Sequence, residues 1–397
     1  MTVNTGFTGF TGFTGFTGFT GFTGFTGFGP GIGGGENPMV ADGLTRSREG
    51  HLGRPTKADS VGGWSRAYVP VLLKDWEVES GTGLPRPGTN LMNRVDRHTR
   101  LQLCVGDFMN SISYDFPERP DFPGVIKGAA GTIFNVHRPS GEVFRAQVHR
   151  VESWAALRAE RAPEILSQLG PQFPYWSSVL HLNPEIVPYT MELLLVALEV
   201  AGNVVQNVKF NMACPRPSDY SPRIQPMVEI PGFFAFPSGH ATQAFMVVEL
   251  LSLLTLRHGA NGADAFWENL QQLSRQAERI ATNRVVAGLH FPIDSEAGCE
   301  LGLRLARYLV GLCTDKVVEF DKLAGAPAHW DMGKPEDAKN RDFDFKIHMK
   351  RQSIFEVGVQ IPLDAIRDAA CPLHIRKKPL QWLWAQAHAE WHKVGVV

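Results

Sequence analysis

The sequence predicts a mostly α-helical fold, a helical bundle with a small β-hairpin element and a disordered N-terminal arm. Three observations support this prediction. Apolar residues between positions 151 and 320 recur at spacings of three and four, as expected for helices with one buried face. A β-branched stretch within residues 131–149 is typical of a hairpin. The chain has 397 residues, 43% of them hydrophobic, which is enough for a sizeable core.

The predicted arm covers residues 1–63. Residues 5–28 repeat Thr-Gly-Phe eight times, and a glycine-rich stretch follows. Thr and Phe occupy the two positions where a collagen triple helix favours proline. We therefore expect a disordered segment, and we place the start of the folded part near Trp64. Alternatively, the regularly spaced Phe side chains associate, and the chain is a non-catalytic interaction protein.

Three regions are expected after the arm. Residues 64–150 form an N-terminal helical and hairpin subdomain, whose hairpin turns at Pro139-Ser140-Gly141. Residues 151–320 form the catalytic helical bundle, and residues 321–397 form a C-terminal extension that packs on it. The bundle helices are predicted at 153–170, 188–208, 238–257, 263–289 and 294–316.

The C-terminal extension contains one clear helical stripe. Leu380, Trp384, Ala387 and Trp391 follow one another at helical spacing. The stripe is short and interrupted by charge. We expect it to pack on the bundle or on a second subunit of a homo-oligomer, rather than on a membrane.

Charge and cysteine content restrict the partners. With 39 Lys and Arg against 40 Asp and Glu, the formal charge is -1, so we expect no nucleic-acid partner. The five cysteines are widely spaced and lack a Cys-x-x-Cys pair, which fits neither a disulfide framework nor a zinc site.

The distribution of apolar residues bears on location. Residues 191–208 and 241–256 are the most apolar stretches, and both contain polar residues, so we expect no transmembrane span. No secretory signal is visible at the N-terminus. The default expectation is a cytoplasmic protein, with other export routes left open.

Three polar segments lie at predicted helix ends. The first presents Lys209 and Arg216, where a helix runs into a Pro-rich loop. The second is Pro-Ser-Gly-His, in which Ser238 begins a helix. Gly239 lets an anion approach the unpaired N–H groups of that helix, and His240 follows. Taken alone, the first segment is more typical of a solvated C-terminal turn of a helix, and the second is equally typical of a plain Ser N-cap followed by a His.

The third segment contains Arg284, His290 and Asp294. Gly288 and Pro292 indicate that one helix ends before His290 and that another begins near Asp294, where this residue can cap the helix. Asp294 can also accept from the imidazole of His290 and fix its tautomer. The alternative is a structural cap beside a surface histidine.

Together the segments read Lys-x6-Arg-Pro, Pro-Ser-Gly-His and Arg-x5-His-x3-Asp, over residues 209–294. This pattern resembles the type 2 phosphatidic acid phosphatase and vanadium haloperoxidase superfamily. The resemblance implies a helical bundle of the acid phosphatase and haloperoxidase type, with a site that binds phosphate or vanadate. Asn283 departs from the pattern, because the phosphatase signature usually has Ser there. Phe233 resembles the aromatic approach to the second motif in haloperoxidases.

The resemblance also implies roles for the residues. Lys209, Arg216 and Arg284 would hold the oxyanion together with Ser238 and the N–H of Gly239. His290, oriented by Asp294, would attack phosphorus or ligate vanadium. His240 would act as the acid/base.

Two activities follow from these roles. We favour a haloperoxidase that holds vanadate as cofactor and uses peroxide and halide, in a soluble chain that acts on a small-molecule substrate. The alternative is an acid phosphatase that needs no metal and forms a phosphohistidine on His290.

Overall fold

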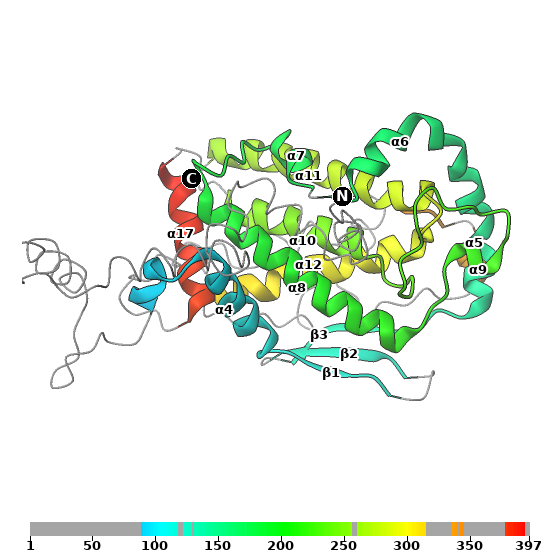
Figure 1. The fold of residues 1–397 in the computed structure, drawn as a ribbon, viewed down its shortest axis with the longest axis horizontal. Helices are drawn as coiled ribbons and strands as arrows, with labels where there is room; N and C mark the ends of the chain where they lie inside the picture. Colours follow the sequence, from blue (N-terminus) through cyan, green and yellow to red (C-terminus); the bar gives the residue numbers. More distant parts are fainter. Residues whose placement is uncertain are drawn as a thin grey trace, which may run out of the picture. The chain divides into compact units, whose positions relative to one another are not determined.

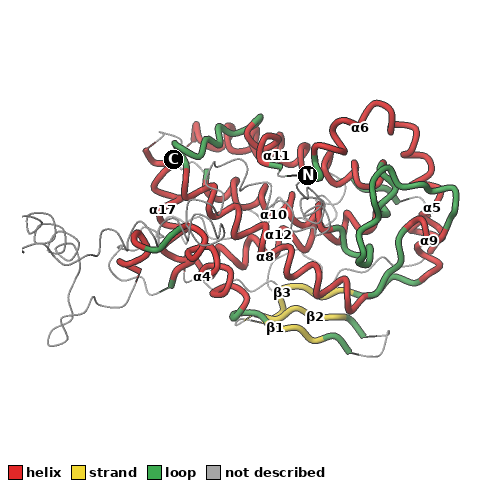
Figure 2. Tube along the Cα trace, in the orientation of Figure 1, coloured by secondary structure: helices red, strands yellow, loops and turns green. Residues whose placement is uncertain are grey.

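The computed structural model describes residues 89–117, 122–128, 131–170, 172–255, 260–314, 335–339, 341–344 and 378–393. The predicted arm and the boundary near Trp64 lie outside these ranges. The described part is mostly helical with one small sheet, which confirms the predicted fold class (Figures 1 and 2). A short 3-10 helix, η4 (Thr89–Arg94), belongs to one compact unit of the chain, and the described residues from Val95 onward belong to another. The proposed division at residues 150 and 320 stays a prediction.

The second unit contains the helices that position the site. In chain order they are α4 (Arg97–Met109), α5 (Gly141–Trp154), α6 (Arg158–Ser167), α7 (Phe173–Ser177), α8 (Pro188–Met212), α9 (Pro217–Tyr220), α10 (Gly239–Leu254), α11 (Ala260–Val286), α12 (Pro292–Thr314), α13 (Pro335–Lys339) and α17 (Pro379–Lys393). The predicted helices at 188–208, 238–257, 263–289 and 294–316 are therefore confirmed, with small differences at their ends.

Helix α10 lies at the centre of the bundle, where it packs against α8, α11 and α12 (Figure 1). Its contact with α12 is unusually close because α12 presents two glycines to it. A Cβ at Gly298 would lie 2.6 Å from the carbonyl oxygen of Ser238, and one at Gly302 would lie 2.3 Å from that of Thr242. The two helix backbones thus touch where α10 begins.

The sheet differs from the predicted hairpin. It has three antiparallel strands in the order β1 (Ser113–Asp115), β2 (Gly124–Gly128) and β3 (Gly131–Val136). Only the first half of the expected hairpin is a strand.

The second half of the expected hairpin is helix α5, so the prediction of a turn at Pro139-Ser140-Gly141 is wrong. Ser140 is the N-cap of α5, and its Oγ accepts from Val143 N. The β-branched residues that suggested a strand also fit helical spacing, because Val143, Gln147 and Val151 are all buried on one side of α5.

The predicted helix at 153–170 is not continuous. Helix α5 ends at Trp154, a 3-10 turn η5 (Ala155–Leu157) follows, and α6 then runs to Ser167 with Pro163 inside it. Helix α6 packs on α11. The break turns the chain so that the end of α6 meets the last turn of α11.

The turn between α11 and α12 is fixed by backbone geometry. Leu289 N donates to Arg284 O and Gly288 N to Val285 O, which is the hydrogen-bond pattern of a Schellman motif. Gly288 has a φ of 77°, which glycine adopts without strain. Pro292 then begins α12. The helix end predicted before His290 is confirmed.

Helix α17 packs against α4, α8 and α12, and it buries the predicted stripe. The carboxylate of Glu390 accepts from the backbone N–H groups of Tyr189 and Thr190, at 2.7 and 2.8 Å, and from Thr190 Oγ1. These are donors of the first turn of α8, which has no capping side chain of its own. The C-terminal helix therefore caps the helix that carries Lys209.

Replacing Glu390 by Gln should lower the free energy of unfolding by about 1–3 kcal/mol, because hydrogen bonds to a charged group are lost while a buried polar group remains. Urea unfolding would measure this change. Glu336→Gln, at an exposed position of α13, is the matched control and should change stability little. Equal stability of the two variants would show that the cap is energetically unimportant.

Candidate active site

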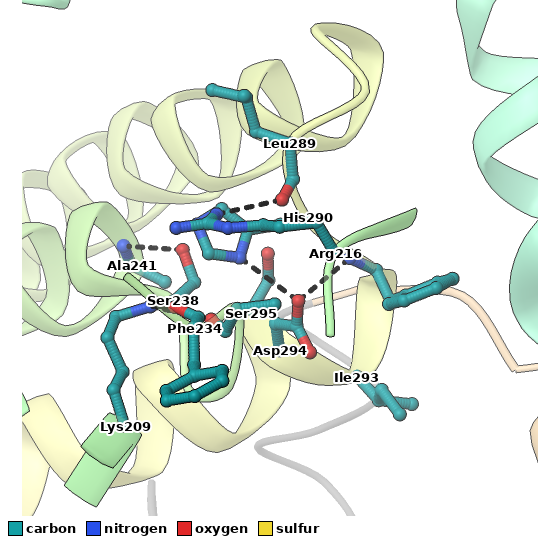
Figure 3. Close-up of polar contacts among 12 residues, drawn as sticks. Lys209, Arg216, Phe234, Ser238, Ala241, Leu289, His290, Ile293, Asp294 and Ser295 are labelled. Atoms are coloured by element: carbon teal, nitrogen blue, oxygen red, sulfur yellow. Dashed lines mark hydrogen bonds and ion pairs between the residues drawn. The ribbon is translucent and has the colours of Figure 1, made fainter. Parts of the chain in front are cut away.

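The starts of α10 and α12 meet at the centre of the site (Figure 3). Ser238 is the N-cap of α10, and its Oγ accepts from Ala241 N at 3.4 Å. Its own N–H donates to the carbonyl oxygen of Asp294 in the first turn of α12, at 2.9 Å. Gly239 follows Ser238 and a Cβ there would lie 3.7 Å from the nearest heavy atom, in Val205. The start of α10 therefore lies against the backbone of the third motif.

Asp294 does not cap α12 in the predicted way. The helix begins at Pro292, so Asp294 is its third residue, and its Oδ2 reaches back to accept from Phe291 N at 2.9 Å. This is the return half of a capping box. The same Oδ2 accepts from His290 Nδ1 at 3.0 Å. One carboxylate oxygen thus fixes both the helix start and the imidazole.

The contacts of His290 define its tautomer. Arg216 Nη1 lies 3.1 Å from His290 Nε2. A guanidinium can only donate, so Nε2 must present its lone pair. The proton is therefore on Nδ1 and is donated to Asp294. The imidazole is neutral, and the nitrogen without a proton faces the cations.

Arg216 is held by backbone carbonyls. Its guanidinium donates to Phe233 O from Nε and Nη2, and to Leu289 O from Nη1 at 2.9 Å. Its backbone N–H donates to Asp219 Oδ2 at 2.7 Å, at the start of α9. Arg216 thus links the second and third motifs.

Lys209 lies in the last turn of α8 and is 1% exposed. Its Nζ donates to the carbonyl oxygens of Phe234 and Ala235, at 2.8 and 2.7 Å. The ring of Phe233 is 5.2 Å from this Nζ and 5.3 Å from Cζ of Arg216. The loop before α10 therefore gathers both cations (Figure 3).

Arg284 completes the set of cations and is fully buried. Its Nη2 donates to Ile165 O at 3.0 Å and to Gln168 Oε1 at 3.2 Å. Its Nε and Nη1 have no hydrogen-bond partner among the described residues. Burial lowers the pKa of Arg284 to about 10, so it stays charged at neutral pH. A buried guanidinium with two unused donors is suited to binding an anion.

His240 is the second residue of α10 and is partly exposed. Its Nε2 lies 3.2 Å from the carbonyl oxygen of Gln168. Burial, followed by the charge of Arg284, lowers the pKa of His240 to about 3. This residue is neutral at pH 7 unless a negative charge comes near it.

Burial also shifts the other two titrating groups of the site. It lowers the pKa of His290 well below its ordinary value, and the charges of Arg216 and Lys209 act in the same direction. Burial raises the pKa of Asp294, against the hydrogen bond from Phe291 N and the two cations. The contact between His290 and Asp294 is thus a hydrogen bond from a neutral imidazole, not an ion pair.

All eight residues singled out in the sequence lie at ends of helices that meet here. Direct contacts join Arg216, His290, Asp294 and Ser238, while Lys209 is joined to the loop before α10 and Arg284 to α6. Gln168, which contacts both His240 and Arg284, is absent from the predicted site. No local pattern distinguishes a glutamine at a helix end, so the sequence offered no signal for it.

Comparison with known proteins supports the family. Residues 191–316 match the model of the PAP2 superfamily, which confirms the superfamily that the three motifs suggested. Among solved structures, the chain is similar to a transmembrane PAP2-type phosphatidylglycerolphosphate phosphatase from Bacillus subtilis. The identity is 20%, the match covers 45% of this chain and 86% of that chain, and the TM-score is 0.27. None of the curated proteins matches the chain.

The expectations about membranes and location need correction. The segment Pro188–Tyr220, which contains α8, is long and apolar enough to cross a membrane, with a mean hydropathy of 1.4 over 18 residues. The expectation of no transmembrane span is therefore wrong, and the cytoplasmic default is not retained. Polar residues such as Glu192 and Asn203 interrupt the segment, but its mean hydropathy remains high enough for a membrane span. Inside the protein, 61% of this window is buried.

The pKa shifts predict how stability depends on pH in the protein without bound anion. Below about pH 6.5 an unfolded histidine takes up a proton, whereas the folded-state pKa of His240 is about 3. Stability is therefore lost as pH falls from about 6.5 towards 3. His290, whose pKa is also lowered on folding, adds to this trend, and Asp294, whose folded pKa is raised, opposes it in the same range.

The slope of the unfolding free energy against pH reports how many protons the chain takes up on unfolding. His240→Gln should reduce this number by close to one between about pH 4 and pH 6, because His240 binds a proton there only in the unfolded state. Urea unfolding at several pH values in phosphate-free buffer would measure both slopes. The prediction fails if wild type and variant have the same slope.

Proposed function

We propose that this chain is a phosphatase that hydrolyses phosphoric monoesters through a phosphohistidine on His290. The observation that carries the proposal is the protonation state of this residue. Its Nε2 has a lone pair, its Nδ1–H is bonded to Asp294, and burial together with the nearby cations lowers its pKa and keeps it neutral. A neutral imidazole that is oriented by a carboxylate is a nucleophile ready at neutral pH.

The surrounding donors fit a phosphoryl group. Two N–H groups of Arg284 have no partner in the described part of the chain, and Nη1 of Arg216 lies 3.1 Å from Nε2 of His290. The N-terminus of α10 adds backbone donors next to Ser238 and Gly239. Binding of a phosphate would move the Arg216 donor from Nε2 to a phosphate oxygen and free the lone pair. These groups would also stabilise the charge of the transition state.

In the first step, Nε2 of His290 forms a bond to phosphorus, and the bond from phosphorus to the ester oxygen breaks. The leaving oxygen takes a proton from His240. A bound phosphate dianion beside His240 raises the pKa of this residue, which opposes the effects of burial and of Arg284. The substrate itself thus prepares the acid.

In the second step, water attacks the phosphohistidine. His240, now neutral, accepts a proton from the water as the new bond from oxygen to phosphorus forms. The bond from phosphorus to Nε2 breaks, and inorganic phosphate leaves. His290 regains its lone pair, and Asp294 still holds its Nδ1–H. No atom outside the chain, the ester and water is needed.

The proposal predicts that His290→Ala abolishes hydrolysis of an aryl phosphate, because the nucleophile is lost. His240→Ala should cost a factor of about 10²–10⁴ with an alkyl phosphate, whose poor leaving group needs an acid. The same substitution should reduce the rate of hydrolysis by a smaller factor when the substrate is p-nitrophenyl phosphate. Colorimetric phosphate release would measure both.

His149→Ala, at an exposed position of α5, is the matched histidine control and should keep full activity. Rapid acid-free quenching and phosphorus NMR would detect the phosphohistidine in the wild type. Full turnover by His290→Ala, or a wild type that hydrolyses no phosphomonoester, would overturn the proposal.

A second candidate is the haloperoxidase that the sequence favours. The observation for it is Phe233, which resembles the aromatic approach to the second motif in haloperoxidases and whose ring lies 5.2 Å from Lys209 Nζ and 5.3 Å from Arg216 Cζ. The site suits vanadate for the same reasons as phosphate, with His290 Nε2 as ligand and Arg284 among the donors. Bound vanadate would supply the activation of peroxide for oxidation of a halide.

One pair of assays separates the two activities. For a phosphatase, vanadate should be a tight reversible inhibitor of aryl phosphate hydrolysis, because its five-coordinate adduct mimics the in-line transition state. For a haloperoxidase, the vanadate-loaded protein should brominate a phenol indicator with peroxide, and phosphate should hardly compete once loading is complete. Vanadate inhibition without halide oxidation would leave only the phosphatase.

A further inference from the structure

Gln168 lies outside the three motifs, yet it contacts the ends of two of them. It is fully buried and caps the C-terminus of α6. Its Oε1 accepts from Asn283 Nδ2 at 3.0 Å and from Arg284 Nη2 at 3.2 Å. Its backbone carbonyl lies 3.2 Å from His240 Nε2. These three contacts join residues that are 72, 115 and 116 positions apart.

The orientation of the Gln168 amide is determined by its partners. Arg284 can only donate, so the atom facing it must be the amide oxygen. The amide nitrogen then donates to Glu164 Oε1 at 3.0 Å. Asn283 is fixed in the same way, because its Oδ1 accepts from Arg161 Nη1 at 3.1 Å. The network has one consistent arrangement of donors and acceptors.

The amide has an electrostatic consequence for Arg284. A neutral acceptor fixes Nη2 without adding a charge of its own, and two other donors of the guanidinium have no partner among the described residues. A carboxylate at the same place would neutralise much of that charge. Glu164, the nearby carboxylate, is instead paired with Arg279, at 2.8 Å. Gln168 therefore separates the buried cation from the carboxylate on its own helix.

The carbonyl has a consequence for His240. A carbonyl oxygen only accepts, so Nε2 of His240 carries a hydrogen, and Nδ1 is left to exchange a proton. The charged or titrating groups that act on His240 are Arg284, Lys209, Arg216 and His290. Three of these are cations and none is an anion, so a charge introduced at residue 168 would change the field at His240 strongly.

We propose that Gln168 is a positioning residue of this site, which orients Arg284 for the oxyanion and sets the tautomer of His240 while adding no charge. The proposal rests on the proposed function for its catalytic meaning. Its core, that residue 168 controls oxyanion binding through Arg284, can be tested by binding alone.

The test compares Gln168→Glu and Gln168→Met with wild type. Glu keeps the shape and adds a charge beside Arg284, whereas Met keeps the length and removes the acceptor. Gln172→Glu is the matched control, because Gln172 is also buried, lies four residues later, and its Oε1 has no hydrogen-bond partner among the described residues. Thermal unfolding would show that each variant is folded.

The first readout is binding of inorganic phosphate, by isothermal titration calorimetry at pH 7. Gln168→Glu should weaken binding at least about tenfold, because the new carboxylate would neutralise much of the Arg284 charge that attracts phosphate. An opposite charge within about 4–6 Å typically shifts a pKa by one unit or more, which corresponds to a factor of about ten. Gln168→Met should weaken it about three- to tenfold, because Arg284 loses its orientation. Gln172→Glu should bind as wild type does.

The second readout is the pH profile of aryl phosphate hydrolysis. In Gln168→Glu the added negative charge should raise the pKa of His240, so the limb of the pH–rate profile that reports His240 should shift by about one unit to higher pH. A merely structural defect would instead lower kcat at every pH. Wild-type phosphate affinity in both folded Gln168 variants would overturn the inference. A wild-type protein that binds phosphate but hydrolyses no ester would overturn the proposed function. The inference about Gln168 would then be decided by the comparison of phosphate binding alone.

Discussion

The close approach of α10 and α12 is the constraint on which the site depends. Gly298 and Gly302 let the two backbones touch, and the Ser238 N–H donates to the Asp294 carbonyl where both helices begin. This contact fixes the distance between the second and third motifs without any side chain of the site taking part. A side chain at either glycine would push the helices apart, and misplacement by about 1 Å is enough to slow catalysis strongly.

The site is maintained at a cost in stability. Arg284 is buried with two N–H groups that have no partner among the described residues, and Lys209 and Arg216 are buried near the carboxylate of Asp294. Grouped cations and unpaired donors destabilise a folded chain unless other contacts compensate. The compensation comes from the apolar body of α10, which is buried almost entirely, and from carbonyl oxygens that accept from the cations.

Features determined by short-range geometry could be predicted from the sequence. Ser238 begins a helix and Gly288 ends one, because capping and left-handed turns restrict which residues fit. The sequence predicts a strand after Pro139, where the structure has helix α5, because β-branched residues at this spacing fit both the strand period and the helix period. Gln168 could not be predicted, because its function depends on contacts with residues more than 70 positions away.

The cap that Glu390 provides to α8 also orders events during synthesis. Helix α8 leaves the ribosome about 180 residues before Glu390 does, which corresponds to roughly 10–40 s at typical elongation rates. During that interval the first turn of a long apolar helix lacks its cap, and α17, which later packs against it, is still to be made. The nascent chain therefore passes through a stage in which this long apolar helix is available to whatever binds apolar segments first, whether a chaperone or a lipid bilayer.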